Sequence, residues 1–208
     1  MTVVDSFRTN ATTCEVGTLI PSTRYSAWPE DVTGLERIML MARGELQRLL
    51  STFFAETISI KTIYANTSPR TTPASPEQPI TQKREVHLVC KGKTVCVATS
   101  TVTLTSPECE RLFLDDKYAV GQMFRKMGTP ANFDLLDTGV CVDDVTGKRE
   151  LWRRYVLAMP GFECEIVETF PDRDMFTRGA AWLTDEPVRQ FGAVEAKRRY
   201  ANNVPVMA

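Results

Sequence analysis

An acidic residue, Glu168, interrupts the apolar side of a segment that is typical of a β-strand. Side chains of a strand alternate between its two faces, so Glu168 shares a face with Cys164, Ile166 and Phe170. A buried carboxylate must be paired or protonated, because an isolated charge in a low dielectric costs several kcal/mol. The position of Glu168 therefore predicts a cation close to it.

Arg153 is the expected partner of Glu168. The Pro160-Gly161 dipeptide between them is typical of a tight turn, because proline presets one backbone angle and glycine accepts a positive φ. A hairpin symmetric about this dipeptide places Arg153 opposite Glu168, whereas a loop of odd length shifts the register by one residue. Taken alone, the pair is either a structural ion pair at the rim of a sheet or part of a binding site.

Arg84 adds a second cation to this arrangement. It shares one face of a predicted strand with the apolar residues Val86, Leu88 and Cys90. A guanidinium group binds a carboxylate through two parallel hydrogen bonds. Two arginines and one carboxylate on apolar faces predict a pocket for an anionic, partly apolar small molecule. His87 has the opposite parity, so we expect it on the surface of the sheet.

The elements that position these residues predict an α+β domain. Their order favours a single antiparallel β-sheet of about six strands with helices packed on one side. Apolar residues at helical spacing predict two helices within residues 35–53, with a turn at residues 43–45. Strands are expected at residues 58–64, 84–90, 94–104, 133–142, 151–158 and 163–170, and short helices from residues 106 and 118.

Three segments are expected to lie outside the core of the one globular domain, which covers residues 35–171. Residues 1–34 are predicted to be an irregular N-terminal arm. Residues 66–83 contain four prolines among Thr, Ser and Gln, which predicts a mobile loop. Residues 172–208 are expected to be a C-terminal helical extension with a helix at residues 185–200, which could cover a sheet edge, pack over the pocket or make a dimer contact.

Composition and charge argue against several classes of partner. The chain has 208 residues, of which 43% are hydrophobic and 25% charged, and its formal net charge of -1 gives no general attraction to nucleic acid or anionic membranes. No apolar run approaches membrane-spanning length, and the N-terminus lacks the pattern of a secretory signal. We therefore expect a cytoplasmic protein, a monomer or homodimer, whose partner is a small anionic or aromatic molecule rather than nucleic acid or membrane.

The six cysteines are expected to be reduced thiols, because none forms a C-x-x-C pair and several occupy apolar strand positions. With His87 as the single histidine, a zinc site would need a cysteine cluster whose spacing is absent. The sequence thus predicts neither a metal nor a cofactor.

Four pieces of the chain occur in an order that resembles the chorismate lyase (4-hydroxybenzoate synthetase) family, whose members split chorismate into 4-hydroxybenzoate and pyruvate. Each motif is short, and their order and spacing over about residues 35–171 carry the resemblance. The four pieces are the helices and strand of residues 35–64, Arg84-Glu85-Val86, Val120-Gly121-Gln122-Met123-Phe124, and Arg153-Arg154 followed by Val167-Glu168-Thr169-Phe170.

The resemblance implies a chorismate-lyase-like fold, a carbon-oxygen lyase activity and a role for each motif. Glu168 is similar to the catalytic carboxylate of the family, acting as acid, base or hydrogen-bond partner, and Arg84 to the arginine that binds the ring carboxylate. Val120 and Gly121 match a helix start whose backbone N–H groups bind a ligand carboxylate. Arg153 would hold Glu168 ionised or bind the pyruvyl carboxylate.

The chain departs from the family at two of these positions. Glu45 stands at the substrate-binding turn where many members have Ser or Thr, and a carboxylate beside a dianion is unfavourable. Tyr118-Ala119 stands where the family has Thr-Pro. Two alternatives stay open: an enzyme (lyase, isomerase or pericyclic catalyst) of the same fold acting on another small carbonyl or polyketide-type metabolite of secondary metabolism, and a non-catalytic small-molecule-binding module.

Overall fold

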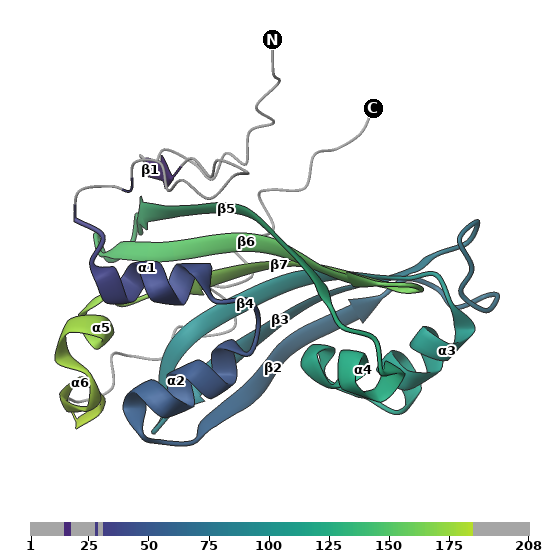
Figure 1. Cartoon of the computed structure of the whole chain (residues 1–208), viewed down its shortest axis with the longest axis horizontal. Coiled ribbons are helices and arrows are strands. Elements are labelled where there is room, and N and C mark those ends of the chain that lie inside the picture. The colour runs from purple at the N-terminus through teal and green to yellow at the C-terminus, as the bar shows by residue number, and fades with distance from the viewer. Residues whose placement is uncertain (1–14, 18–27, 29–30, 185–208) are drawn as a thin grey trace, which may run out of the picture.

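One antiparallel sheet organises the chain, as the computed structural model in Figure 1 shows. The structure describes residues 15–17, 28 and 31–184. Six long strands confirm the expected sheet, and a seventh, three-residue strand lies in the arm that was expected to be irregular. In sheet order the strands are β1 (Glu15–Gly17), β5 (Asn132–Val142), β6 (Arg149–Met159), β7 (Phe162–Phe170), β4 (Lys93–Leu104), β3 (Ile80–Cys90) and β2 (Ile58–Thr67).

The described helices form two groups that pack on the same face of this sheet, as expected for the α+β class. In Figure 1 one group gathers at the left of the sheet and the other at the lower right. The first group consists of α1 (Gly34–Met41), α2 (Leu46–Phe54), α5 (Asp174–Arg178) and α6 (Ala180–Thr184). The second consists of α3 (Pro107–Glu110), the π-helical turn η1 (Arg111–Asp115) and α4 (Val120–Met127).

The β6–β7 hairpin has the predicted two-residue turn. Met159 pairs with Phe162 around Pro160-Gly161, and Arg153 pairs with Glu168, so the predicted register is confirmed. Gly161 has φ +83°, and a Cβ atom there would lie 2.5 Å from Cβ of Ser106 at the start of α3. Both the backbone angle and this close approach require glycine.

The two faces of the sheet differ in what covers them. On the helix face, Cys164, Ile166 and Phe170 belong to the two apolar clusters under the helices. We call the opposite face the open face. The strand residues that belong to these two clusters lie on the helix face and not on the open face. Its central residues, all on facing pairs, are Tyr64, Glu85, His87, Val97, Thr99, Trp152, Arg154, Val167 and Thr169.

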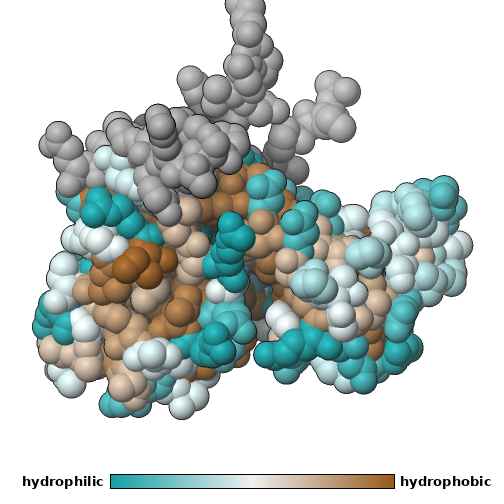
Figure 2. Space-filling model, viewed as in Figure 1, coloured by the Kyte–Doolittle hydropathy of each residue, from teal (hydrophilic) through white to brown (hydrophobic). Residues whose placement is uncertain are grey.

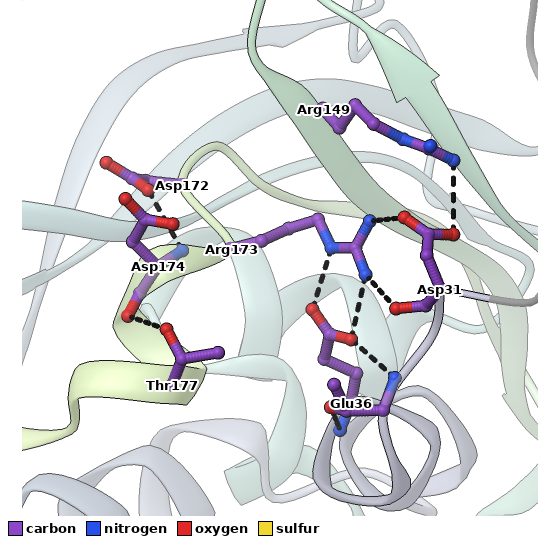
Figure 3. A network of polar contacts seen from close by, with 8 residues as sticks. Asp31, Glu36, Arg149, Asp172, Arg173, Asp174 and Thr177 are labelled. Carbon is purple, nitrogen blue, oxygen red and sulfur yellow. Dashed lines mark hydrogen bonds and ion pairs between the residues drawn. The ribbon is translucent and has the colours of Figure 1, made fainter.

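The N-terminal end of α1 is fixed by a capping box and by a buried ion pair (Figure 3). The backbone N–H of Thr33 donates to Oε2 of Glu36 at 2.7 Å, and Thr33 Oγ1 accepts from the Glu36 N–H at 3.3 Å. Arg173, just before α5, donates to both Glu36 oxygens at 2.7 and 2.9 Å and to Asp31 at 2.6 Å. Arg173 therefore ties the C-terminal helices to the start of α1.

Replacing Arg173 with leucine is expected to lower the free energy of unfolding by roughly 3 to 5 kcal/mol at pH 7, because the carboxylate of Glu36, 1% exposed, loses its partner. Burial alone would raise the pKa of Glu36, but the hydrogen bonds from Arg173 and Thr33 outweigh burial and lower it. A carboxyl group whose folded-state pKa is lowered stabilises the fold above its unfolded pKa and loses that effect as pH falls through the folded value.

The difference between Arg173→Leu and wild type should therefore shrink as the pH falls below about 4.5, which urea unfolding at pH 7 and pH 3 measures. Arg48→Leu is the matched control, because the Arg48–Glu45 pair is 75% and 54% exposed. A difference of the same size at both pH values would contradict the role given to the Glu36 carboxylate.

The loop between β2 and β3 is docked on α3 and η1. Arg70 donates to Glu110 at 2.7 Å and to Asp115 at 2.7 and 3.1 Å. The N–H of Ala74, a fully buried residue, donates to the other Glu110 oxygen at 2.8 Å. The mobility expected for residues 66–83 stays a prediction, and the strands extend into this segment from both sides, to Thr67 and from Ile80.

The remaining expectations concern the cysteines, the C-terminal helix and membrane-spanning segments. Cys141 is disulfide-bonded, so the expectation of reduced thiols is wrong for it, whereas Cys90, Cys96, Cys109 and Cys164 are free and buried. Cys14 and the helix expected at residues 185–200 lie outside the described residues. Within residues 31–184, the helices are too short or too polar to cross a membrane.

Candidate small-molecule site

The centre of the helix face holds a buried network of Arg153, Glu168 and Tyr155. Arg153 Nε donates to Glu168 Oε2 at 2.6 Å, and the Tyr155 hydroxyl donates to Glu168 Oε1 at 2.9 Å. The three residues are 0%, 5% and 3% exposed. β6 supplies Arg153 and Tyr155 on one face because they are two residues apart, and β7 supplies Glu168 opposite Arg153.

Arg153 also closes the C-terminal end of α1. Its Nη1 atom donates to the carbonyl oxygens of Met39, Leu40 and Ala42 at 3.0, 3.2 and 2.5 Å. These carbonyls lie where a helix end leaves acceptors without partners. The other terminal nitrogen, Nη2, is buried and has no hydrogen-bond partner in the part of the chain that the structure describes. The Arg153 side chain therefore stabilises the fold whether or not a ligand binds nearby.

The network raises the pKa values of two of its members, Arg153 and Tyr155. Burial opposes the charge on Arg153, but the neighbouring Glu168 carboxylate outweighs burial, so the pKa of Arg153 is raised. Burial and then the charge of Glu168 raise the pKa of Tyr155 well above its usual value. The tyrosine therefore remains a neutral hydrogen-bond donor. Each oxygen of Glu168 accepts one bond and, with two lone pairs, retains the capacity to accept another.

Arg84 lies on the same face without a carboxylate partner. It is half-buried, its guanidinium carbon lies 5.7 Å from the ring centre of Phe113 in η1, and within residues 31–184 it forms no ion pair. Burial lowers the pKa of Arg84, yet an arginine stays protonated at neutral pH. A charged guanidinium that is partly desolvated and unpaired is suited to binding an anionic ligand.

The floor between Arg84 and Glu168 is made of small side chains. On the intervening strand, Ser100 lies opposite Arg84 and Ala98 lies opposite Glu168. From the spacing of strands and residues, the Cα atoms of Arg84 and Glu168 lie about 12 Å apart. Figure 2 shows the surface hollowed between the two groups of helices, on the side where α2 and α4 face each other. We take this hollow as the candidate site, because Arg84, Ser100, Ala98 and Glu168 lie on the same face of the sheet as the two groups of helices.

Cys164, which also lies on this face, is not suited to act as a nucleophile. Burial raises its pKa to about 12, although the nearby Arg84 opposes that shift. A thiol is a good nucleophile only as a thiolate, so Cys164 stays protonated and inert at neutral pH. Its neighbour Ser100 hydrogen-bonds to it and completes the floor beside Arg84.

Val120 and Gly121 begin α4, as the sequence predicted. Ala119 precedes the helix, and its own N–H donates to the side chain of Gln122 at 2.9 Å. The N–H groups of Val120 and Gly121 have no acceptor among the described residues, as is normal in the first turn of a helix. Val120 packs against the apolar cluster that also contains Ala98 and Ile166, so α4 starts on the helix face of the sheet.

Glu45 does not join the buried network. It lies in the turn between α1 and α2, where Gly44 has φ +74° and Glu45 has φ +54°. Its carboxylate pairs with Arg48 at 2.5 Å, and its side chain is 54% exposed. The turn itself is the predicted one, but the charge of Glu45 is compensated on the surface.

Two hollows elsewhere on the described surface do not include these residues. One surrounds the Arg173 cluster of Figure 3, where the charged groups are already paired with one another. The other lies beside the β6–β7 turn at Thr105 and Gly161 and has little charge. We favour the hollow on the helix face because Arg84, a half-buried cation without a carboxylate partner among residues 31–184, lies on that face.

A scan against protein-family models gives no match for this sequence, and no curated protein matches it. The resemblance to chorismate lyases therefore enters below as a proposal, together with the roles that it implies.

Three contributors to the site were not predicted. The parity of Tyr155 with Arg153 was visible in the sequence and could have indicated its contact with Glu168. The α1 carbonyls around Met39 and the ring of Phe113 had no such signal, because both reach the sheet from distant parts of the chain.

Proposed function

We propose that the protein is a carbon-oxygen lyase that splits chorismate into 4-hydroxybenzoate and pyruvate in the hollow of the helix face. The observation that carries this proposal is Arg84, a half-buried cation without a carboxylate partner among the described residues, on the same face as Glu168. A small molecule with a carboxylate on a ring fits the distance between them, with the ring over Ala98 and Ser100.

The reaction requires positioning more than a strong nucleophile. The ring loses a proton beside the ether carbon, and the electrons of that C–H bond complete the aromatic ring. The electrons of the C–O bond leave with enolpyruvate, which becomes pyruvate when a proton adds to its carbon. Aromatisation drives the reaction, so binding the substrate in a reactive conformation supplies much of the rate.

Each residue has a role in this proposal. Arg84 binds the ring carboxylate through paired hydrogen bonds, and the N–H groups of Val120 and Gly121 are donors for the second carboxylate. Glu168 accepts a hydrogen bond or a proton from the ring side of the substrate, using lone pairs that Arg153 and Tyr155 leave available. Arg153 donates to Glu168 and holds its carboxylate in place.

Replacing Arg84 with glutamine should weaken the binding of 4-hydroxybenzoate by roughly 2 to 4 kcal/mol, because a charge-assisted pair is lost while the ligand carboxylate stays desolvated. Isothermal titration calorimetry on both proteins measures the difference. Lys83→Gln is the matched control, because Lys83 is the preceding residue, is exposed and lies on the opposite face. Equal affinities of Arg84→Gln and wild type would contradict the anion site.

A non-catalytic binding module is the second candidate, and one observation favours it. Both oxygens of Glu168 already accept hydrogen bonds, and its partner Arg153 is fully buried and holds α1. In that case Glu168 is structural and Arg84 alone anchors the ligand. Binding of 4-hydroxybenzoate without release of pyruvate from chorismate would identify this function.

A lyase, isomerase or pericyclic catalyst for another small carbonyl metabolite is the third candidate. Its ground is the departure of the sequence from the family at Glu45, although the Glu45 carboxylate pairs with Arg48 on the surface and not with the buried network. An enzyme for another anionic substrate would need Arg84 for binding but would release no pyruvate from chorismate. The Arg84→Gln titration and the chorismate assay together therefore distinguish this candidate from the chorismate lyase.

A further inference from the structure

Arg84 has an aromatic neighbour, Phe113, that belongs to a rare type of helical turn. The guanidinium carbon of Arg84 lies 5.7 Å from the ring centre of Phe113, within the range of a cation–π contact. Phe113 is 5% exposed and also packs edge-on against Phe162 of β7, with the ring centres 5.4 Å apart. It is the middle residue of η1, where the N–H of Asp116 donates to the carbonyl oxygen of Arg111 at 2.9 Å. Because π-helical turns are rare and frequent at functional sites, this contact indicates that η1 contributes to the site.

Arg70, in the loop between β2 and β3, joins the two ends of η1. Its Nε atom donates at 2.7 Å to Glu110, the residue before η1. Its two terminal nitrogens donate to the two oxygens of Asp115, the last residue of η1, at 2.7 and 3.1 Å. All three nitrogens of the guanidinium group therefore bind η1 or the residue before it. We call Arg70, Glu110 and Asp115 the η1 clamp.

The geometry of the η1 clamp is stronger than that of an ordinary surface ion pair. The side chains of Arg70 and Asp115 are 39% and 48% exposed, and single pairs of this kind contribute little. Here the arginine–carboxylate pair is bidentate, and Glu110 is only 10% exposed. The second Glu110 oxygen accepts from the N–H of Ala74 at 2.8 Å, and Ala74 belongs to the same apolar cluster as Phe113. The loop is thus attached to η1 by both polar and apolar contacts.

The contact with Phe113 affects how Arg84 can bind an anion. The ring attracts the charge of the half-buried guanidinium group and restricts its orientation. A guanidinium group has five N–H donors, so most of them remain available for a carboxylate. A cation that is already held in one orientation loses less conformational freedom when a ligand binds, which increases the affinity.

We propose that the η1 clamp is a positioning device for the ligand site: Arg70 acts through η1 to hold Phe113 against Arg84, and opening the clamp weakens the binding of an anionic ligand. The inference rests on the anion site proposed above and applies whether that site is catalytic or only binds a ligand. Opening the clamp would leave the Arg153–Glu168 pair intact, because that pair is on β6 and β7.

Arg70→Gln tests the proposal, because glutamine remains polar but cannot form the bidentate pair. Phenylglyoxal modifies accessible arginines, so mass spectrometry after treatment measures how well Arg84 is shielded. We expect Arg84 to react roughly three- to tenfold faster in the variant, and calorimetry to show 4-hydroxybenzoate binding weakened by the same factor, the size of one cation–π contact. Arg153, 0% exposed, is the internal control and should stay unmodified in a folded sample.

Arg111→Gln is the matched control variant. Arg111 is the first residue of η1 and pairs with Asp116 at 2.6 Å, with side chains 58% and 40% exposed, but it is not part of the η1 clamp. This variant should leave the reactivity of Arg84 and the affinity unchanged. Phe113→Leu should reproduce both effects of Arg70→Gln. Combining these two changes should add little, because both act on the same contact.

Unchanged reactivity of Arg84 in a folded Arg70→Gln protein would overturn the proposal. Faster reactivity with unchanged affinity would overturn the role of the clamp in binding. Wild type that does not bind 4-hydroxybenzoate would contradict the anion site itself and the binding role with it, while the phenylglyoxal comparison still decides whether the clamp shields Arg84. If Arg70→Gln does not fold, Asp115→Asn removes the exposed carboxylate of the clamp and is judged by the same two measurements.

Discussion

Arg153→Met is expected to lower the free energy of unfolding by roughly 3 to 5 kcal/mol. The substitution keeps an apolar stem of similar length but leaves the Glu168 carboxylate, 5% exposed, without its cation. It also removes the donor for the carbonyls of Met39, Leu40 and Ala42, so the end of α1 loses its cap. Urea unfolding followed by circular dichroism measures the loss.

The neighbouring residue provides the control for this experiment. Arg154 points to the open face and pairs with Asp137 at 2.6 Å, and both side chains are partly exposed, 26% and 34%. Arg154→Met should therefore cost no more than about 1 kcal/mol. If the two variants were equally stable, Arg153 would not be the residue that fastens α1 to the sheet.

Glu168→Gln is expected to reduce turnover of chorismate by roughly 10² to 10⁴, the range for a positioned acid or base. The amide oxygen can still accept from Arg153, and the amide nitrogen can donate to the Tyr155 oxygen, so the shape of the site is retained. The charge and basicity are lost. Because Arg153 stays buried without a counter-charge, some loss of stability should accompany the kinetic effect.

Turnover must therefore be expressed per folded molecule, with the melting temperature measured on the same sample. Glu163→Gln is the control, because Glu163 is exposed on the other face of β7 and should leave both quantities unchanged. A Glu168→Gln protein that is less stable but turns over chorismate normally would make Glu168 a structural residue only.

Local rules made much of this arrangement predictable. The parity of β7 placed Glu168 with Ile166 and Phe170, and Pro160-Gly161 set the hairpin register that brings Arg153 to Glu168. Both predictions depend only on the period of a strand and on turn chemistry, which are properties of neighbouring residues.

Contacts between distant segments were not predictable in the same way. Arg153 donates to carbonyls of α1 more than a hundred residues earlier, and no local pattern distinguishes such an arginine from one that binds a ligand. Phe113 meets Arg84 only because η1 folds back over β3. The disulfide at Cys141 was missed because the spacing of cysteines in the sequence does not indicate which of them meet.

Incubation of the purified protein with chorismate tests the central claim most directly. Pyruvate, measured with a coupled reductase assay, and 4-hydroxybenzoate, measured by chromatography, should form in equal amounts and well above the spontaneous rate. Both should decrease sharply in Arg84→Gln and remain unchanged in Lys83→Gln. Folded wild-type protein that binds 4-hydroxybenzoate but releases no pyruvate above the rate in buffer would contradict the lyase and leave the anion-binding module.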